Sequence, residues 1–396
     1  MTVPAGLRVA IDARPLDIDS FSTQGIGRYA HGLLDPLHEV ATERGGELVL
    51  LRQQGAKKSP YAYAGNPACD ALVRQVRRPP VPARVADWPE QVLLPIDLRR
   101  TRARVAHSLS IYRSAVWQSI PSVMTILDVV PLMWPDSYLR TGVMHRMLYT
   151  AAKRARLLLA ISEAVRRDAI AQLGVAPERV LTVPLAADRR FRPSDPEPAR
   201  LRFGLEGPFL LYVGGLATAD PRKNLEGLVD AYAEWRRGQG RTETLVLTGR
   251  LGEAARALEA RAARAGAPIR FTGFVRDGDL PSLLSAATCL VSASRYEGFG
   301  LPSLEAISCG TPVVTFDAGA VPEVVGRGGL LVSDGDGVAL MRAVSEVCDN
   351  PGLRARLSAE GLEHARRFSW RRTAELTWQA YETALDGPDQ AGGSRP

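Results

Sequence analysis

Short apolar segments alternate with longer helical segments along most of this chain. The first series runs from residues 7–13 (LRVAIDA) to 179–186, and the second runs from 208–215 to 328–333. Strands that alternate with helices form βαβ units, because a parallel neighbour can be reached only through a long crossover. The sequence therefore predicts an α/β protein with two doubly wound, Rossmann-like domains, each built on a parallel sheet.

A stretch rich in proline and charge separates the two series. Residues 188–207 show no apolar period, which is typical of a linker. We therefore predict an N-terminal domain over 1–187 and a C-terminal domain over 208–368. A last helix is expected over 369–386, and the tail over 387–396 is expected to be disordered. Residues 55–95 are rich in proline and predict an irregular excursion.

The composition is that of an ordinary globular protein with a basic excess. The chain has 396 residues, of which 45% are hydrophobic and 23% charged, and a formal net charge of +7. This balance favours anionic ligands or surfaces, although a general bias towards arginine explains much of it. We predict no nucleic-acid binding, because no basic patch is interleaved with aromatic residues.

Cysteine usage and hydropathy indicate the compartment. The four cysteines are scattered, which favours a reducing environment over a disulfide framework. The first residues lead straight into a strand instead of a signal peptide, and no apolar run is long enough to span a bilayer. We expect a cytoplasmic protein, either free or associated peripherally with the inner face of a membrane.

Residues 294–312 (SRYEGFGLPSLEAISCGTP) carry the strongest functional signal. Proline suits a helix start and glycine a helix end, so we predict a helix over 302–310 with Glu305 in its first turn and Glu297 in the preceding loop. Carboxylates accept hydrogen bonds from sugar hydroxyls, and N–H groups at a helix start suit a diphosphate. The N–H groups in question belong to Gly298, Phe299, Gly300 and Leu301. The stretch predicts a nucleotide-sugar site.

Four other loops also follow predicted strands. Open α/β sheets bind ligands at the carboxyl ends of their strands, so these loops can face one cleft with the glutamate loop. Gly25 and Gly27 could line this cleft or simply form a turn. The candidate residues of these loops are Gly25, Gly27, Asp128, Gly214, Arg222, Lys223, Phe274 and Val275.

The ordered set of motifs resembles a retaining glycosyltransferase of the GT-B type, family 4, a group that includes bacterial mannosyltransferases. The resemblance covers residues 7 to about 385. It implies two domains around a cleft and a C-terminal helix that crosses back onto the first domain. The motifs are QGIGRYA (24–30), LAISEAVRRD (159–168), YVGG with DPRKN (212–224), FTGFVRDGD (271–279) and EGFGLPSLEA (297–306).

The resemblance also implies roles for individual residues. Glu305 would hold the ribose hydroxyls of the donor, Glu297 would face the transferred sugar, and the glycine turn would touch sugar and phosphate. Phe274 and Val275 would lie beside the nucleobase, although both could equally belong to the core. Either glutamate alone could be an ordinary surface residue, and their pairing in this context favours the site.

Arg222 and Lys223 follow the first strand of the second half. Cations there would neutralise the diphosphate and stabilise the charge that grows on it as it leaves. We therefore expect no metal and no cofactor besides the donor substrate. Asp334 and Asp336 resemble a metal-binding pair, but they lie in a glycine-rich turn and are not assigned to a metal.

Two positions depart from the family pattern. Many relatives carry arginine where this chain has Gly215, so Arg222 is a candidate replacement. Many also carry histidine where this chain has Leu127, which leaves Asp128 as the nearest ionisable group. Asp128 could orient an acceptor hydroxyl or cap the following turn. With no strong general base, the departing phosphate oxygen could take the acceptor's proton on the same face.

We predict a glycosyltransferase that moves a hexose from a nucleotide diphosphate-sugar, with GDP-mannose as the first guess, and retains the anomeric configuration. The acceptor would be a saccharide, a lipid-linked molecule or a natural product. The alternatives are an inactive subunit that binds sugar nucleotides, and an epimerase or hydrolase of the same fold.

Overall fold

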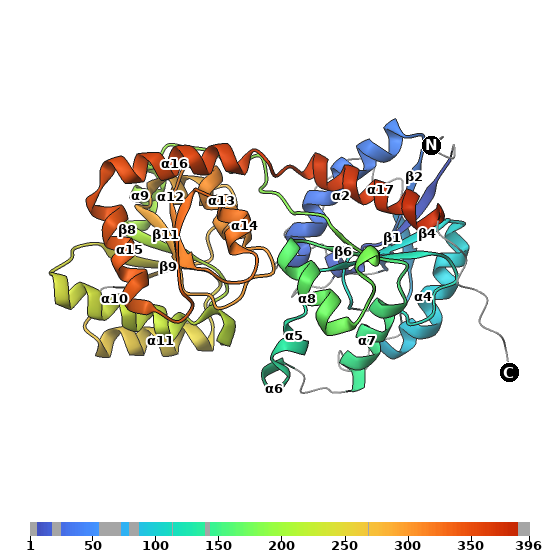
Figure 1. The fold of residues 1–396 in the computed structure, drawn as a ribbon, viewed down its shortest axis with the longest axis horizontal. Coiled ribbons are helices and arrows are strands. Elements are labelled where there is room, and N and C mark those ends of the chain that lie inside the picture. The colour runs from blue at the N-terminus through green and yellow to red at the C-terminus, as the bar shows by residue number, and fades with distance from the viewer. Residues whose placement is uncertain are drawn as a thin grey trace. The chain divides into compact units, whose positions relative to one another are not determined.

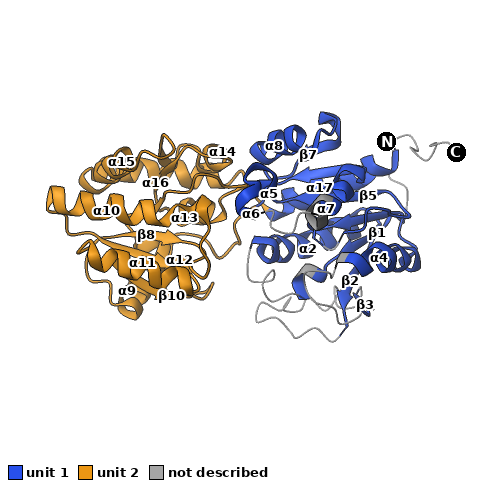
Figure 2. Cartoon of the chain, turned by 90° about the horizontal axis from the view of Figure 1, so that it is seen from below, with its two compact units in different colours: residues 1–185, 370–396 blue, residues 186–369 orange. Residues whose placement is uncertain are grey.

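A computed structural model describes residues 6–17, 25–54, 73–78, 87–112, 114–138, 143–267 and 269–386. The chain forms two compact units, shown as a ribbon in Figure 1 and coloured separately in Figure 2. Unit 1 comprises residues 1–185 and 370–396, and unit 2 comprises residues 186–369.

Unit 1 is built on a seven-stranded parallel sheet with the order β3-β2-β1-β4-β5-β6-β7. The central strands are almost fully buried because helices cover both faces, as in other all-parallel sheets. The strands are β1 (Arg8–Asp12), β2 (Glu47–Gln53), β3 (Val73–Val76), β4 (Val105–Ser108), β5 (Ser122–Ile126), β6 (Leu157–Ala160) and β7 (Val180–Thr182).

The helices of unit 1 follow from local signals such as those of α8 (Glu163–Leu173). The Ser162 hydroxyl accepts a hydrogen bond from Val165 N–H at its start, and Gly174 ends it in the left-handed conformation. The other α-helices are α2 (Gly25–Glu43), α4 (Asp87–Thr101), α5 (Val130–Met133), α6 (Pro135–Tyr138), α7 (Val143–Arg154) and α17 (Trp370–Asp386).

Helix α17 returns to unit 1 and packs beside α2, which confirms the predicted crossover helix (Figure 1). Two glycines make room for its aromatic side chains. A Cβ atom at Gly46 would lie 2.3 Å from the Trp378 ring, and one at Gly32 would lie 2.1 Å from the Trp370 ring. An ion pair between Arg371 and Glu43 closes the contact on the outside.

A buried chain of hydrogen bonds fixes α17 against the sheet. His107 on β4 bonds through Nδ1 to the Tyr381 hydroxyl at 2.6 Å and through Nε2 to the Thr125 hydroxyl at 2.9 Å. The Thr125 hydroxyl also bonds to Tyr29 of α2 at 2.7 Å. Burial lowers the pKa of His107 to about 3, so the ring is held neutral in the folded protein.

A second buried network fixes α4. Arg14, just after β1, donates to Asp12 at 2.6 Å and forms an ion pair with Glu90 of α4. Arg78, just after β3, donates to Glu90 at 2.9 Å and to Asp97 at 2.7 Å. Because every charge in the network has an opposite partner, burying it does not leave an uncompensated ion.

Unit 2 is built on a six-stranded parallel sheet with the order β10-β9-β8-β11-β12-β13, which confirms the second doubly wound domain. Its strands are β8 (Phe209–Val213), β9 (Thr244–Thr248), β10 (Ile269–Gly273), β11 (Cys289–Ser292), β12 (Val313–Phe316) and β13 (Gly329–Val332). Its α-helices are α9 (Glu197–Phe203), α10 (Leu225–Gln239), α11 (Glu253–Arg264), α12 (Leu280–Ala286), α13 (Leu301–Ser308), α14 (Val321–Val325), α15 (Gly337–Asp349) and α16 (Pro351–Ala365).

Two predicted irregular regions contain regular structure. Residues 188–207, predicted to be a linker, belong to unit 2 and include α9, which packs against α12. The predicted excursion over 55–95 contains β3 and the first half of α4. Tertiary contacts stabilise these short elements despite their weak sequence signals. The predicted disordered tail over 387–396 lies outside the described residues.

Among the residues that the structure describes, no helix combines the length and the apolar character required to cross a bilayer.

The buried imidazole predicts a specific dependence of stability on pH. Its pKa is about 3 in the folded protein and about 6.5 when unfolded. Between these values only the unfolded chain binds the proton, so stability falls as the pH falls below about 6.5, by up to about 1.4 kcal/mol per pH unit. In His107→Gln this contribution should be absent, which urea unfolding at pH 7, 6 and 5 will measure. Parallel losses in wild type and variant would contradict the prediction.

Candidate functional site

The strand order of unit 2 places a topological switch point between β8 and β11. The chain runs from β8 outward through β9 and β10, then returns to β11 on the other side of β8. Connections on the two sides leave in opposite directions, which opens a crevice at the carboxyl ends of the two central strands. The loops that follow β8 and β11, together with the start of α13, contain most of the predicted site residues.

The loop after β8 presents two cations. Asp220 accepts a hydrogen bond from the backbone N–H of Arg222 at 3.1 Å and starts a short 3₁₀ turn over Pro221–Lys223. The same carboxylate binds the Arg222 guanidinium through two contacts of 2.8 and 3.1 Å. Arg222 is therefore held in place by Asp220, a partner that the sequence analysis did not assign.

Lys223 and Glu297 join the loops after β8 and β11. The Lys223 ammonium lies 2.7 Å from Oε1 and 2.8 Å from Oε2 of Glu297. A backbone hydrogen bond of 2.7 Å from Arg295 N–H to the Arg222 carbonyl runs beside this ion pair. The Lys223 and Glu297 side chains are 23% and 18% exposed, so both charges remain accessible to a ligand.

The glycine turn after Glu297 leads directly into α13. Gly300 has φ +90°, a conformation that favours glycine, and its carbonyl accepts from the N–H groups of Ser303 and Leu304. The helix begins at Leu301, one residue before the predicted start, so Glu305 lies in its second turn and the first-turn prediction is wrong. The Glu305 side chain is only 3% exposed.

The amino end of α13 offers backbone donors. No described residue accepts a hydrogen bond from the N–H groups of Phe299, Gly300 or Leu301. Together with the helix dipole these groups form a place for an anionic oxygen. The Phe299 ring itself packs into the core against Phe368, with ring centroids 5.9 Å apart, so only its backbone faces the turn.

The loop after β12, which contains Gly319, packs against the backbone of Glu297. Ala320 N–H donates to the Glu297 carbonyl at 2.9 Å. Gly319 has φ +59°, and a Cβ atom there would lie 2.4 Å from the same carbonyl oxygen. The position of Glu297 therefore depends on the absence of a side chain at residue 319.

Tyr212, the fourth residue of β8, is a site residue that the sequence analysis missed. Its hydroxyl is buried, has no hydrogen-bond partner among the described residues, and lies 2.4 Å from where a Cβ of Gly214 would be. Burial raises the pKa of this phenol, and the charges of Glu297 and Asp220 raise it further. A residue with a polar hydroxyl group in an otherwise apolar strand (FLLYV) was the available signal.

The remaining predicted donor-binding residues lie two strands away, after β10. Val275 is buried, so it belongs to the core, whereas the Phe274 side chain is half exposed. Gly215 is exposed and a Cβ there would meet no atom within 4 Å, which leaves room at this sheet edge.

Three predicted residues lie in unit 1. Gly25 and Gly27 form the first turn of α2, which begins at Gly25, instead of a loop before the helix. Asp128 follows β5 and accepts a hydrogen bond from Val130 N–H at 3.1 Å, the turn-capping contact. Burial raises the pKa of Tyr149, and Tyr112 and Asp128 raise it further, so Asp128 shares its surroundings with two tyrosines.

One member of the aspartate pair after β13 has a structural role. Asp336 accepts a hydrogen bond of 2.7 Å from Ala339 N–H and caps α15. Within the described ranges, no group of three or more metal-ligating side chains occurs.

Comparison with known proteins identifies the family. Residues 207–350 match the family described as "Glycosyl transferases group 1". O-antigen chain mannosyltransferase B of Escherichia coli is 33% identical over 270 residues, which cover 66% of this chain and 70% of that protein. This chain is a group 1 glycosyltransferase. Serotype-specific mannosyltransferase WbdA of Escherichia coli is 27% identical over 300 residues, which cover 72% of this glycosyltransferase but only 36% of WbdA.

Solved structures show the same fold. Sucrose-phosphate synthase from Thermosynechococcus elongatus superposes with a TM-score of 0.72 at 21% identity, covering 95% of this enzyme and 98% of that chain. The two parallel-sheet domains and these neighbours confirm the GT-B fold of the glycosyltransferase.

The contact of Gly319 with Glu297 predicts a loss of activity without a loss of fold. In Gly319→Ala the new methyl group must displace the Glu297 backbone, and a displacement of about 1 Å can cost about 100-fold in kcat/KM. Gly335→Ala is the matched control, since Gly335 also has a positive φ of +80° but has no atom within 4 Å of its Cβ position. Steady-state kinetics and melting temperatures of both variants will test this prediction. A kcat/KM of Gly319→Ala equal to that of Gly335→Ala would contradict it.

Proposed function

We propose that this glycosyltransferase transfers mannose from GDP-mannose to a saccharide or lipid-linked acceptor, with retention of configuration and without a metal ion. The observation that supports this most strongly is the Lys223–Glu297 ion pair at the switch point of unit 2, beside Arg222 and the amino end of α13.

The diphosphate of the donor would take the position between the cations and the helix start. Lys223 and Arg222 would contact the phosphate oxygens, and the N–H groups of the glycine turn would donate to them. Glu297 would remain bonded to Lys223 on one side and accept from a hydroxyl of the transferred sugar on the other. Glu305 would accept from the ribose hydroxyls, as the family resemblance implies.

The leaving diphosphate gains negative charge as the glycosidic bond breaks. Fixed cations stabilise that charge more in the transition state than in the bound donor, so they contribute to the rate and not only to affinity. The same cations would do the work for which other transferases use a divalent ion. In the retaining route, the departing phosphate oxygen accepts the proton of the acceptor hydroxyl as that hydroxyl attacks the same face of the sugar.

The names of the related proteins support mannose as the sugar, because the two Escherichia coli relatives are both mannosyltransferases. We assign the acceptor to unit 1, where Asp128, which follows β5, lies near Tyr112 and near Tyr149 of α7. An acceptor with a lipid anchor would bring the enzyme to the inner face of a membrane as a peripheral protein.

Removal of the Lys223 charge should lower turnover strongly. We expect Lys223→Met to reduce kcat by about 100- to 1,000-fold, the usual cost of one donor to a developing anion. Lys153→Met is the control, because Lys153 is an exposed lysine on α7. Transfer of radiolabelled mannose from GDP-mannose to membrane-extracted acceptors will measure the effect.

The double variant Lys223→Met with Glu297→Gln separates stability from catalysis. It removes both charges, so it should recover any stability lost by stranding Glu297 without recovering turnover. Turnover near the wild-type value in Lys223→Met would contradict the site. If the wild-type protein binds the donor but shows no turnover, the chain is instead a subunit that only binds the donor.

The stereochemical course can be tested directly. With GDP-α-mannose in the presence of EDTA, the first product seen by proton NMR should carry an α-mannosyl linkage, while UDP-glucose should give no product. A β-linked product would overturn retention. Activity that EDTA abolishes and Mg²⁺ restores would overturn the metal-independent route.

A further inference from the structure

The outer face of α4 in unit 1 exposes an apolar stripe. Trp88, Val92 and Ile96 are 54%, 63% and 39% exposed. Their spacing of four residues places them on one face of the helix. Leu94 and Leu98, on the opposite face, are buried in the unit 1 core.

The buried ion network keeps this stripe pointing outward. Glu90 and Asp97 lie on the inner face of α4, where they bind Arg14 and Arg78. Turning the helix to hide the stripe would pull two carboxylates away from their cations, which is costly in a buried position. The exposed stripe is therefore a fixed feature of the folded unit.

A second tryptophan lies next to the stripe. The loop after β4 runs along α4: Gln91 of the helix binds Ser114 and Val116, and the Ser119 hydroxyl donates to the Pro95 carbonyl. This loop carries Trp117, which is 70% exposed and lies under the Arg154 guanidinium at 3.7 Å. Among the described residues, Trp88 and Trp117 are the tryptophans with large exposed surfaces.

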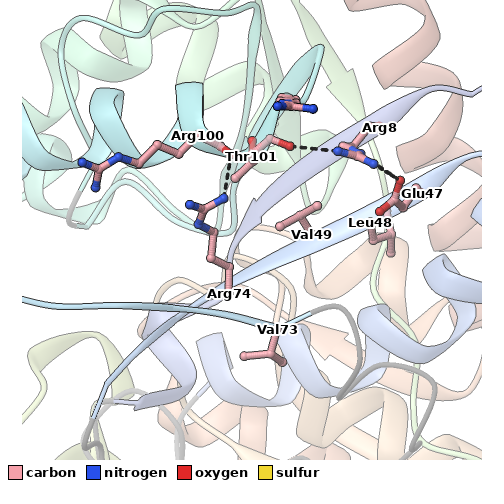
Figure 3. A pocket seen from close by; sticks show the side chains of 9 residues that line it. Arg8, Glu47, Leu48, Val49, Val73, Arg74, Arg100 and Thr101 are labelled. Atoms are coloured by element: carbon pink, nitrogen blue, oxygen red, sulfur yellow. Dashed lines mark hydrogen bonds and ion pairs between the residues drawn. The ribbon is translucent and has the colours of Figure 1, made fainter.

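Arginines border the stripe on its other side and at its end. A cavity of about 380 Å³ between β3 and α4 is lined by Arg74, Arg77 and Arg100 together with Ile96. A second cavity of about 500 Å³, at the amino ends of β1 and β2, also includes Arg74 and Arg100 (Figure 3). Figure 3 shows Arg74 directed at the Arg100 carbonyl, to which it donates at 2.6 Å.

Most of the arginines that border the stripe have no carboxylate partner among the residues that the structure describes. In the described ranges, neither Arg74 nor Arg77 forms an ion pair with a carboxylate. Arg100 approaches Asp97 only at 3.9 Å. An apolar strip bordered by such cations is complementary to a partner that is apolar inside and anionic at its border.

We propose that this surface, formed by α4, the 114–119 loop and the β3 arginines, docks unit 1 on an anionic lipid bilayer. Tryptophan side chains favour the headgroup level of a membrane, and arginines there bind lipid phosphates. Val92 and Ile96 would enter the boundary with the acyl chains, and the two basic cavities would receive headgroup phosphates. The proposal rests on the proposed function only in that a lipid-linked acceptor would be met at this surface.

The experiment measures binding of the full chain to vesicles, without any donor or acceptor. Wild-type protein should co-sediment with vesicles of phosphatidylcholine and phosphatidylglycerol, and much less with phosphatidylcholine alone. Val92→Asp should weaken binding at least tenfold, because it places a like charge against the anionic lipid. Val338→Asp is the matched control: Val338 is 73% exposed on α15 of unit 2 and should bind as wild type does.

A charge variant tests the basic border separately. Arg74→Ala with Arg77→Ala should weaken binding by about fivefold per arginine, and salt should reduce wild-type binding in the same way. Transfer to a detergent-soluble acceptor should stay at the wild-type rate in Val92→Asp. If the wild-type enzyme shows no transfer to this acceptor, the proposed function is contradicted, but the docking proposal is unaffected because vesicle binding is measured without donor or acceptor.

Two outcomes would overturn the docking proposal. One is equal co-sedimentation of wild type and Val92→Asp with the anionic vesicles. The other is a wild-type dimer that light scattering detects, that Val92→Asp splits, and that leaves vesicles unbound; the stripe would then be an interface between two copies of the chain.

Discussion

The ion pair between Lys223 and Glu297 joins two loops that leave neighbouring parallel strands. Its two contacts of 2.7 and 2.8 Å hold both side chains in one geometry, yet neither is fully buried. A partly exposed ion pair of this kind contributes only modestly to the free energy of folding. Its value lies in position, because it keeps an ammonium group and a carboxylate together at the switch point where a parallel sheet binds its ligand. The glycine turn and α13 are then fixed relative to that pair.

Much of this arrangement could be predicted from the sequence because parallel sheets impose it. Once strands alternate with helices, the residues that follow the strands must gather at one edge, whatever the loops look like. Lys223 and Glu297 are far apart in sequence but follow adjacent strands, β8 and β11, so their meeting is a consequence of topology. The left-handed glycine at 300 and the helix after it follow from local conformational preference.

Other features depend on tertiary contacts that no local pattern reveals. The role of Asp220 as the partner of Arg222, and the burial of the Tyr212 hydroxyl against Gly214, arise from how a loop folds over the sheet. Phe299 stands in the site motif, but its ring reaches Phe368 and serves the core. Helix α9 forms in a proline-rich stretch because it packs against α12, where the Ser282 hydroxyl accepts a hydrogen bond from Ala199 N–H, and these contacts override its weak propensity.

The two units use the same topological position differently. In unit 1 the switch point lies between β1 and β4, and Arg14 after β1 is 2% exposed and enclosed by Asp12 and Glu90. In unit 2 the corresponding cation, Lys223, is open on one side and shares a single carboxylate. A buried cation that is fully paired with carboxylates of the protein cannot bind an external anion strongly. A partly exposed cation that has one carboxylate partner can still do so. This difference supports our proposal that the diphosphate binds in unit 2. In unit 1 the arginine at this position instead forms buried ion pairs, and through Glu90 these fix α4, the helix that carries the exposed Trp88.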